Sequence, residues 1–353
     1  MMTVRQAFEQ VLKGRSLDAA ESEGVFSEIL DNVVPEVLVA AFLIALRMKG
    51  ETAGELAGGT RSMRQRARAL KLLDHSVSNP APVKLLDTAG TGGDNAGTFN
   101  ISTGAAMIAA TAGIPTAKHG NRAVSGRVGA ADVLESFGVR LELEPPGLQR
   151  CLDQARICFV FAPAYHPVLS RLAALRRNLG TRTIFNLMAP MANPARPSYQ
   201  LLGVAEPRLM RPVAEALAML AIEHALVVHG NDGLDEISIA APTSVIEVRD
   251  GKLEEYTISP EMFGLNTASA RALLIEDRRE SMELLRRTMS GDPGPARDVL
   301  ALNAGAAIYA GNGAPTLAEG VQRANDILGS GRALETIEKL RVASHQAAVM
   351  ERS

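Results

Sequence analysis

The segment from Leu85 to Gly113 carries the residue types of an anion-binding loop. Its apolar start leads into glycines, and amide and hydroxyl side chains follow where an alanine-rich helix is predicted to begin: Gly90, Gly92, Gly93, Gly97, Asn100, Ser102 and Thr103. Glycines let a backbone approach a ligand closely, and the free N–H groups at the start of a helix attract negative charge. We therefore predict that this loop binds phosphate; a plain connecting turn is the alternative.

The loop matches neither of two common nucleotide-binding motifs. A Walker A loop requires a Lys-Ser/Thr pair after the glycines, and this sequence has none there. Asn95 stands at the third glycine of a dinucleotide-binding fingerprint, and Ala110 and Thr111 stand where an acid would bind the ribose. Dinucleotide binding is therefore disfavoured.

A second loop, Lys118–Gly129, combines three cationic side chains, a histidine and several glycines. A flexible basic loop beside a phosphate loop suits a ligand that carries more than one phosphate group. A solvated basic turn is the alternative. His119 on its own is more typical of a hydrogen-bonded structural residue than of a base.

Acidic residues follow the apolar run Ala225–Val228, a predicted strand. Ligands of α/β folds bind at the carboxyl ends of strands, and the adjacent Asp235 and Glu236 would suit Mg²⁺ shared with phosphate oxygens. Solvated acids that cap the next helix are the alternative. Arg176 and Arg177 end a predicted helix, where an arginine either grips a carboxylate in bidentate fashion or faces water.

Helical periodicity dominates the first 75 residues, which are predicted to form a small bundle. The first helix presents one apolar face, and three more helices follow it: Val4, Phe8, Val11 and Leu12 on the first, then Ala19–Leu30, Pro35–Lys49 and Ala53–Leu72. We find no strand signal in this block.

Short apolar runs then alternate with helical segments, which indicates an α/β domain with a mostly parallel sheet. The predicted strands are Val83–Leu86, Ile114–Ala117, Ile157–Phe161, Thr183–Phe185 and Ala225–Val228. Two further runs flank Asp250-Gly251, the signature of a β-hairpin: Val245–Val248 and Leu253–Ile258. The chain is predicted to be helical again from about Pro295.

Composition excludes several classes of function. The net charge is −2 and aromatic residues make up 4%, with no Trp, so neither a general basic field nor a base-stacking platform for nucleic acid is expected. The longest apolar run, Val37–Leu46, is about half a membrane span. Cys151 and Cys158 have no metal-ligand spacing, and the charged N-terminus does not read as a signal peptide. We expect a cytoplasmic protein with reduced thiols.

Six stretches carry a specific pattern, in register along nearly the whole chain: GTGGDNAGTFNIST at Gly90–Thr103, KHGNRAVSGRVGAADVLESFG at Lys118–Gly138, FAPAYHP at Phe161–Pro167, RRNLGTRTIFNLMAPMANPA at Arg176–Ala195, HGNDGLDEIS at His229–Ser238 and LNAG at Leu302–Gly305. Together they resemble the anthranilate phosphoribosyltransferases. The resemblance implies transfer of the phosphoribosyl group of phosphoribosyl pyrophosphate to the amino group of anthranilate. Pyrophosphate is released, and the step belongs to tryptophan biosynthesis.

The resemblance also implies a fold, a cofactor and an assembly. Residues 1–75 would form a helical domain to which roughly 170–200 return, and 80–170 with 200–345 would form a large α/β domain hinged to it. The expected partners are the two small-molecule substrates, with Mg²⁺ as cofactor, as two ions. A homodimer through the helical domains is expected, and neither nucleic acid nor a membrane is.

The site residues implied by the resemblance come from both loops and from the acidic segment. Phosphoribosyl pyrophosphate would contact Gly90, Gly93, Asp94, Thr98, Asn100, Ile101, Ser102, Thr103, Lys118, His119, Gly120, Asn121, Arg122, Ala123, Val124, Ser125, Gly126 and Ala130. Anthranilate would contact Gly90, Asn121 and Arg176, and magnesium would bind Ser102, Asp235 and Glu236. Lys118 would stabilise the leaving pyrophosphate, and His119 is the first candidate for a general base.

Several positions depart from the family pattern around the anthranilate pocket. Ala130 replaces a frequent serine, Val128 a small polar residue, Tyr165 a frequent histidine and Ala189 a glycine. Two alternatives remain open from the residues alone. One is an enzyme like the pyrimidine nucleoside phosphorylases, and the other is a non-catalytic relative that binds nucleic acid or a protein partner.

Overall fold

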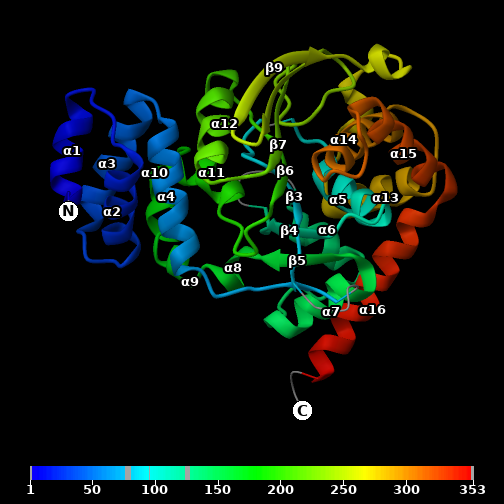
Figure 1. The fold of residues 1–353 in the computed structure, drawn as a ribbon, viewed down its shortest axis with the longest axis horizontal. Helices are drawn as coiled ribbons and strands as arrows, with labels where there is room; N and C mark the ends of the chain where they lie inside the picture. Colours follow the sequence, from blue (N-terminus) through cyan, green and yellow to red (C-terminus); the bar gives the residue numbers. More distant parts are fainter. Residues whose placement is uncertain (1, 76–80, 95, 124–127, 351–353) are drawn as a thin grey trace.

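The computed structural model describes residues 2–75, 81–94, 96–123 and 128–350. Its first four helices form a bundle at one end of the molecule (Figure 1): α1 (Val4–Leu12), α2 (Ala19–Leu30), α3 (Glu36–Lys49) and α4 (Ala53–Arg66). Thr3, Asp18 and Thr52 each cap a helix by accepting a hydrogen bond from the backbone three residues later. The bundle therefore follows from helix-start signals that are visible in the sequence.

Seven strands form the central sheet in the order β5-β4-β3-β6-β7-β8-β9. Their bounds are β3 (Leu86–Gly90), β4 (Thr116–Gly120), β5 (Ile157–Phe161), β6 (Tyr199–Gly203), β7 (His224–Gly230), β8 (Thr243–Arg249) and β9 (Lys252–Ile258). The strands from β5 to β7 run parallel, and β8 and β9 are antiparallel to their neighbours. A short separate pair joins β1 (Leu73–Asp74) to β2 (Ala81–Pro82).

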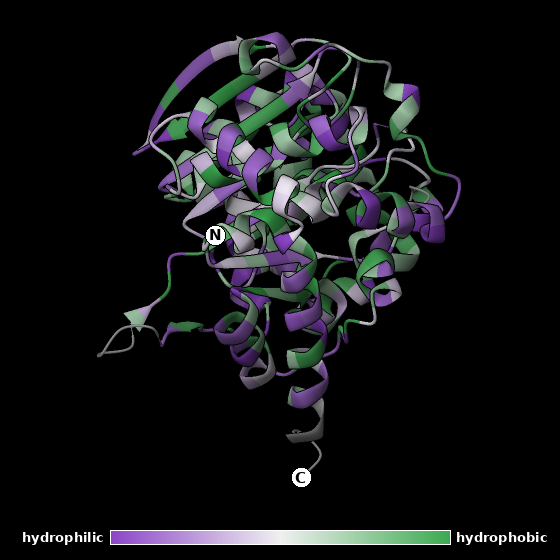
Figure 2. Cartoon of the chain, turned by 90° about the vertical axis from the view of Figure 1, so that its right-hand side faces the viewer, coloured by the Kyte–Doolittle hydropathy of each residue, from purple (hydrophilic) through white to green (hydrophobic). Residues whose placement is uncertain are grey.

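Helices connect the strands and cover both faces of the sheet (Figure 1). They are α5 (Ile101–Thr111), α6 (Ala130–Ser136), α7 (Pro145–Ala155), α8 (Ala162–Tyr165), α9 (Pro167–Arg171), α10 (Ala173–Leu179), α11 (Ile184–Met188), α12 (Met210–Met219), α13 (Arg278–Met289), α14 (Pro295–Ala310), α15 (Leu317–Ser330) and α16 (Arg332–Met350). Single 3-10 turns lie at Ala189–Met191, Pro207–Leu209, Pro260–Phe263 and Ala270–Leu273. Figure 2 shows both the strands and the surrounding helices in mixed green and purple, because most of these elements combine apolar and polar residues.

Two apolar cores meet at the sheet, because alternate side chains of a strand point to opposite faces. In β7, Leu226 and Val228 belong to the core beneath α5, α14 and α15, whereas Ala225 and Val227 belong to the other core. That second core continues through α12 into the helical bundle. The bundle is therefore packed against one face of the sheet through a shared apolar layer.

The fold confirms the predicted class: an N-terminal helical bundle, a mostly parallel sheet and a later hairpin at Arg249–Lys252. One predicted strand is wrong. Thr183–Phe185 begins helix α11, because Thr183 and Asn186 form a capping box that starts a helix there. The strand between β3 and β7 is instead Tyr199–Gly203, which the sequence pattern did not indicate.

Smaller boundary errors occur before and within the sheet. The helix predicted to reach Leu72 ends at Arg66, because Ala67 is extended, and Leu73–Asp74 pairs as a strand in a block that showed no strand signal. Strand β3 begins at Leu86, where the run Val83–Leu86 was predicted to end. The predicted Ile114–Ala117 strand begins at Thr116 and extends to Gly120.

Candidate active site

Four neighbouring parallel strands end in glycine at one edge of the sheet: Gly90, Gly120, Gly203 and Gly230. Because these glycines have no side chains, the segments that follow other strands can approach the ends of these strands closely. A Cβ on Gly90 would lie 2.5 Å from Oδ2 of Asp235, and one on Gly203 would lie 1.6 Å from the Asp235 carbonyl oxygen. The strand-terminal glycines therefore bring the acidic segment against the phosphate loop.

The phosphate loop runs from β3 to the start of α5. Gly92, Gly93 and Gly97 adopt positive φ angles of 63°, 81° and 68°, which glycine adopts at little cost. Asn100, the residue before α5, is fixed by the hydroxyl of Ser281, which donates a hydrogen bond of 2.8 Å to Asn100 Oδ1. Thr98 forms an isolated β-bridge with Leu274. The predicted loop is thus anchored at its far end.

Lys118 lies at the centre of the site. Its Nζ donates to the Thr88 carbonyl at 2.7 Å and to Ser102 Oγ at 3.1 Å, beside the first turn of α5. Burial lowers the pKa of Lys118, and the nearby charges of Asp87 and Glu236 oppose that shift. The structure therefore joins three of the predicted elements, the phosphate loop, the basic loop and the acidic segment, around one ammonium group.

Burial makes the ionisation of Asp235 and Glu236 costly. Asp235 Oδ2 accepts a hydrogen bond of 2.8 Å from the Gly92 backbone N–H. Burial, followed by repulsion from Asp94, raises the pKa of Asp235 to about 7. Burial, followed by repulsion from Asp235, raises the pKa of Glu236 well above its usual range, and Lys118 opposes that rise. Carboxylates in this setting gain from a cation.

The donor set fits a magnesium ion that takes further ligands from a substrate. No group of three or more His, Cys, Asp or Glu side chains forms a complete metal site among the residues that the structure describes. Mg²⁺ commonly binds through one or two carboxylates together with phosphate oxygens. Asp235, Glu236 and the Ser102 hydroxyl offer that kind of partial site.

The basic loop is held at both described ends by Asp132. Its Oδ2 accepts hydrogen bonds from the backbone N–H groups of Ala123 at 3.0 Å and Gly129 at 2.8 Å. Arg122 forms an ion pair with Glu135 and lies over the Phe161 ring, so its charge is already partnered. The predicted contacts Val124, Ser125 and Gly126 lie outside the described residues.

Gly120, Asn121 and Ala130 lie beside one another at the entrance to the basic loop. A Cβ on Gly120 would be 3.3 Å from the Ala130 methyl group, so these positions pack closely. The Asn121 carbonyl accepts a hydrogen bond from Ala131 N, and its side-chain oxygen accepts one from Arg122 N. Within the first turns of α5, Ile101 is buried, and the buried Thr103 hydroxyl has no hydrogen-bond partner among the residues that the structure describes.

His119 lies in a setting unsuited to a general base. Its ring is buried with its centroid 5.3 Å from that of His166. Burial, then His166 and Lys118, lower the pKa of His119 to about 3, so the imidazole is neutral and weakly basic near pH 7. The lowered pKa therefore argues against the base role that the sequence suggested for His119.

A buried hydrogen-bond network that the sequence did not single out supports the basic loop from below. Asp87 accepts hydrogen bonds from His119 N at 3.1 Å and from Asn193 Nδ2 at 2.9 Å. Asn193 Nδ2 also donates to the Ala117 carbonyl at 2.8 Å. Burial raises the pKa of Asp87 to about 6, against the opposing charge of Lys118. The one available signal was an acid inside the apolar run that leads into the phosphate loop.

Arg176 comes from a different part of the fold, helix α10. Its guanidinium is partly buried, lies 5.8 Å from the Phe185 ring, and has its pKa lowered by burial. Within the described parts of the chain, no ion pair joins Arg176 to an acid, whereas many other arginines have one. A guanidinium in this state is available to a carboxylate ligand.

Comparisons with known proteins point to one enzyme family. Residues 82–334 match the glycosyl transferase family a/b domain, and residues 5–67 match the helical bundle domain of the same family. The anthranilate phosphoribosyltransferase of Thermomicrobium roseum is 45% identical over 351 residues, covering 99% of both chains. That of Chloroflexus aggregans is 46% identical over 341 residues, covering 96% of this chain and 98% of the relative.

Solved structures show the same fold. The anthranilate phosphoribosyltransferase of Thermus thermophilus has a TM-score of 0.88 and 38% identity, covering 96% of this chain and 99% of that one. The Saccharomyces cerevisiae enzyme, solved in complex with PRPP and Mg, has a TM-score of 0.84 at 24% identity, covering 97% and 98%. These matches favour the transferase prediction over the phosphorylase and the non-catalytic alternatives. In the part of the chain that the structure describes, no helix is long and apolar enough to span a membrane.

Proposed function

Because the chain belongs to the anthranilate phosphoribosyltransferase family, we infer that it transfers the phosphoribosyl group of phosphoribosyl pyrophosphate to the amino group of anthranilate. The products are N-(5-phosphoribosyl)-anthranilate and pyrophosphate, and the step belongs to tryptophan biosynthesis. One observation in the structure carries the inference furthest. The buried Lys118 ammonium lies between the phosphate loop and an acid pair, as the binding of a magnesium pyrophosphate group requires.

The residue types suit the bond changes of this reaction. As the bond between ribose C1 and pyrophosphate breaks, positive charge builds on the sugar and negative charge builds on the leaving group. The Lys118 ammonium and the N–H groups at the start of α5 would stabilise that negative charge. Mg²⁺, when bound, would supply further neutralisation of the pyrophosphate. Positioning and leaving-group stabilisation then do most of the work.

We assign the substrates to the residues that the sequence indicated. Phosphoribosyl pyrophosphate would lie on Gly90–Thr103 and under the loop that begins at Lys118. The anthranilate carboxylate would pair with Arg176, whose guanidinium has no acid partner among the described residues. Asn121 and Gly90 would line the same pocket. His119 would form part of the buried wall and would not serve as a base, because its pKa is about 3.

Two magnesium ions are proposed because the two acids face different parts of the site. Asp235 lies against Gly92 and Asp94, on the loop side. Glu236 lies toward Lys118 and the backbone of Ser102, on the helix side. We also propose that the enzyme works in the cytoplasm as a homodimer.

The direct test follows anthranilate fluorescence in the presence of protein, phosphoribosyl pyrophosphate and Mg²⁺. We expect the signal to fall only when all three are present. Asp235→Asn and Glu236→Gln should each raise the Mg²⁺ concentration that half-saturates the reaction. A reaction that runs equally well with chelator, or a fluorescence signal that never falls, would contradict the proposal.

A further inference from the structure

Arg182 contacts the phosphate loop from an unexpected direction. It lies in the short segment between α10 and α11, and its Nη2 donates a hydrogen bond of 3.3 Å to the Thr91 carbonyl. A Cβ on Gly93 would lie 2.9 Å from Arg182 Cζ, so the guanidinium fills the space that a side chain at position 93 would need. The guanidinium of Arg182 therefore packs directly against the backbone of the phosphate loop.

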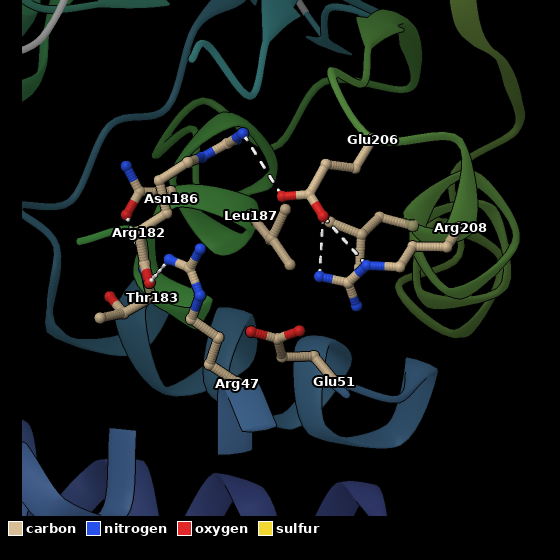
Figure 3. A pocket seen from close by; sticks show the side chains of 9 residues that line it. Arg47, Glu51, Arg182, Thr183, Asn186, Leu187, Glu206 and Arg208 are labelled. Atoms are coloured by element: carbon tan, nitrogen blue, oxygen red, sulfur yellow. Dashed lines mark hydrogen bonds and ion pairs between the residues drawn. The ribbon is translucent and has the colours of Figure 1, made fainter. Parts of the chain in front are cut away.

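The base of this arginine is held by the helical bundle. Arg47, at the end of α3, donates from Nη1 to the Arg182 carbonyl and, at 2.7 Å, to Thr181 Oγ1. Figure 3 shows the Arg47 side chain reaching from α3 to the backbone of this segment. The backbone from which the arginine extends is thus fixed independently of the phosphate loop.

The guanidinium itself is oriented by an acid. Glu206 lies between two arginines, 3.8 Å from Arg182 Nη1 and 2.7 Å from Arg208 Nη2 (Figure 3). The Arg182 side chain is 24% exposed, whereas that of Arg208 is 54% exposed. Glu206 therefore restrains the more buried arginine in the position where it meets the loop.

The turn that Arg182 meets is held by a few other hydrogen bonds, among them one from Ala205 N to Thr91 Oγ1 at 3.2 Å. Thr91 N donates to the Gly203 carbonyl at 2.9 Å and Gly92 N donates to Asp235, but Gly92 and Gly93 bring no side chains of their own. Two consecutive glycines lose much conformational freedom when they are held in one shape. An external group that packs on this turn reduces the number of shapes it can adopt.

We propose that Arg182 is a positioning residue, whose guanidinium holds the Thr91–Gly93 turn in the shape that receives the pyrophosphate group. The proposal rests on the function proposed above for this loop. Arg182 follows helix α10, which contains Arg176, the residue proposed to bind the anthranilate carboxylate. In this role Arg182 would act through the loop, without binding either substrate itself.

The test measures binding of phosphoribosyl pyrophosphate with Mg²⁺ by calorimetry, without anthranilate, and steady-state kinetics beside it. Arg182→Met should weaken binding and raise the KM for this substrate by about tenfold or more, the range for loss of one charged hydrogen bond. We expect kcat and the KM for anthranilate to stay within about threefold of wild type. Arg182→Lys, which keeps one charged donor, should recover part of the affinity.

The matched control is Arg208→Met, which removes the other arginine bound to Glu206 and leaves the phosphate loop untouched. It should bind phosphoribosyl pyrophosphate as wild type does. Equal weakening in both variants, or unchanged binding in Arg182→Met, would overturn the proposal. So would a uniform loss of kcat and of both substrate affinities in Arg182→Lys.

If a thermal unfolding assay shows that Arg182→Met does not fold, Glu206→Gln tests the same proposal. It weakens the hold on the guanidinium without removing any group that touches the loop, and we expect a fall in affinity of about twofold to fivefold. Unchanged affinity in this variant and in Arg182→Lys would exclude the positioning role. Because binding is measured without turnover, a wild-type protein that binds phosphoribosyl pyrophosphate but never consumes anthranilate would contradict the proposed function alone.

Discussion

Single charged residues in this site are held at a cost that a ligand would relieve. Burial opposes the charge on Lys118, Asp235 and Glu236, and repulsion between the acids adds to it. Such groups lower the stability of the free protein in exchange for strong interactions with bound ions and phosphates. Lys118 lies near the end of strand β4, and Asp235 and Glu236 follow the end of β7, so all three lie at the glycine-terminated edge of the sheet.

Arg176 provides the sharpest prediction at this scale because its neighbour serves as a control. Arg176→Lys should raise the KM for anthranilate by about tenfold or more, since a lysine cannot form the bidentate pair, and leave the KM for phosphoribosyl pyrophosphate nearly unchanged. Arg177→Lys changes an exposed side chain on the same helix and should have no effect. Initial rates with each substrate varied separately provide the measurement. Equal effects in the two variants would argue against the assignment.

The residues found from the sequence are those that stand in contiguous motifs. The phosphate loop, Lys118 and the Asp235-Glu236 pair can each be predicted from about a dozen neighbouring positions in the sequence. Asn193 and Arg182 also stand in a motif, Arg176–Ala195, but their roles could not be predicted from it, because these roles arise from contacts with Asp87 and Thr91, far away along the chain. A residue that supports another is visible only once the fold has brought the two together.

At the scale of elements, most of the short apolar runs are strands as predicted, and the two main errors, at Thr183–Phe185 and at β6, have local causes. The hairpin around Asp250-Gly251 has the turn chemistry that defines it, and Asp250 adopts a φ of 50° there. Thr183–Phe185 has β-branched and aromatic residues but also a capping box, and the cap decided its structure. Strand β6 was missed because the polar Gln200, which is buried and donates to the Pro190 carbonyl, interrupts its apolar run.

Helices α14 and α15 pack through glycine, which gives a prediction with an internal control. A Cβ on Gly320 would lie 2.4 Å from the Gly305 carbonyl oxygen, so Gly320→Ala must push the two helices apart. We expect a loss of about 1–3 kcal/mol in the free energy of unfolding. Gly329→Ala in the same helix meets nothing within 4 Å and should be neutral or slightly stabilising. Denaturant unfolding of both variants measures the difference; a destabilised Gly329→Ala would contradict the packing argument.

The far end of the sheet contains a buried carboxylate that predicts a pH dependence of stability. Burial opposes ionisation of Glu247, but hydrogen bonds from His224, Tyr256 and Tyr309 outweigh it and lower the pKa of Glu247 to about 2. A lowered pKa stabilises the fold above the unfolded value of 4.5, and this contribution is lost as the pH falls from 4.5 toward 2.

Glu247→Gln should therefore lower the free energy of unfolding at pH 7 by on the order of 2 kcal/mol. The difference in the free energy of unfolding between this variant and wild type should narrow as the pH falls below 4.5. Thermal unfolding between pH 7 and pH 3 checks both statements. Glu254→Gln, an exposed position opposite Glu247 on β9, should match wild type throughout. A difference in the free energy of unfolding that stays constant with pH would show that the hydrogen bonds to Glu247 do not depend on its negative charge.

At the scale of the whole molecule, the continuous core explains how the helical bundle is held in place. Apolar residues of α1–α4, of the segment 172–192 and of α12 share one core with one face of the sheet. The sequence indicated a bundle completed by a later segment through the family resemblance, because no local pattern reports which distant helix joins a core. We propose that the helical bundle and the α/β part are two domains. Because they share one core, we expect the two domains to unfold together.

The bundle also carries the surface that we propose for the homodimer. Large exposed apolar residues of the described chain concentrate at its N-terminal end, where Leu12 is 59%, Val33 71%, Val37 78% and Met48 83% exposed. Exposed apolar groups of this size gain by being covered, and we propose that a second copy covers them. Light scattering after size exclusion should therefore give twice the mass of one chain.

Val37→Glu should shift the mass toward that of a single chain, because a charge would be buried in the interface. Met262→Glu, at an equally open position outside the bundle, should leave the dimer intact. A wild-type protein that elutes with the mass of one chain at micromolar concentration would exclude this assembly, and an effect of Met262→Glu equal to that of Val37→Glu would place the interface elsewhere.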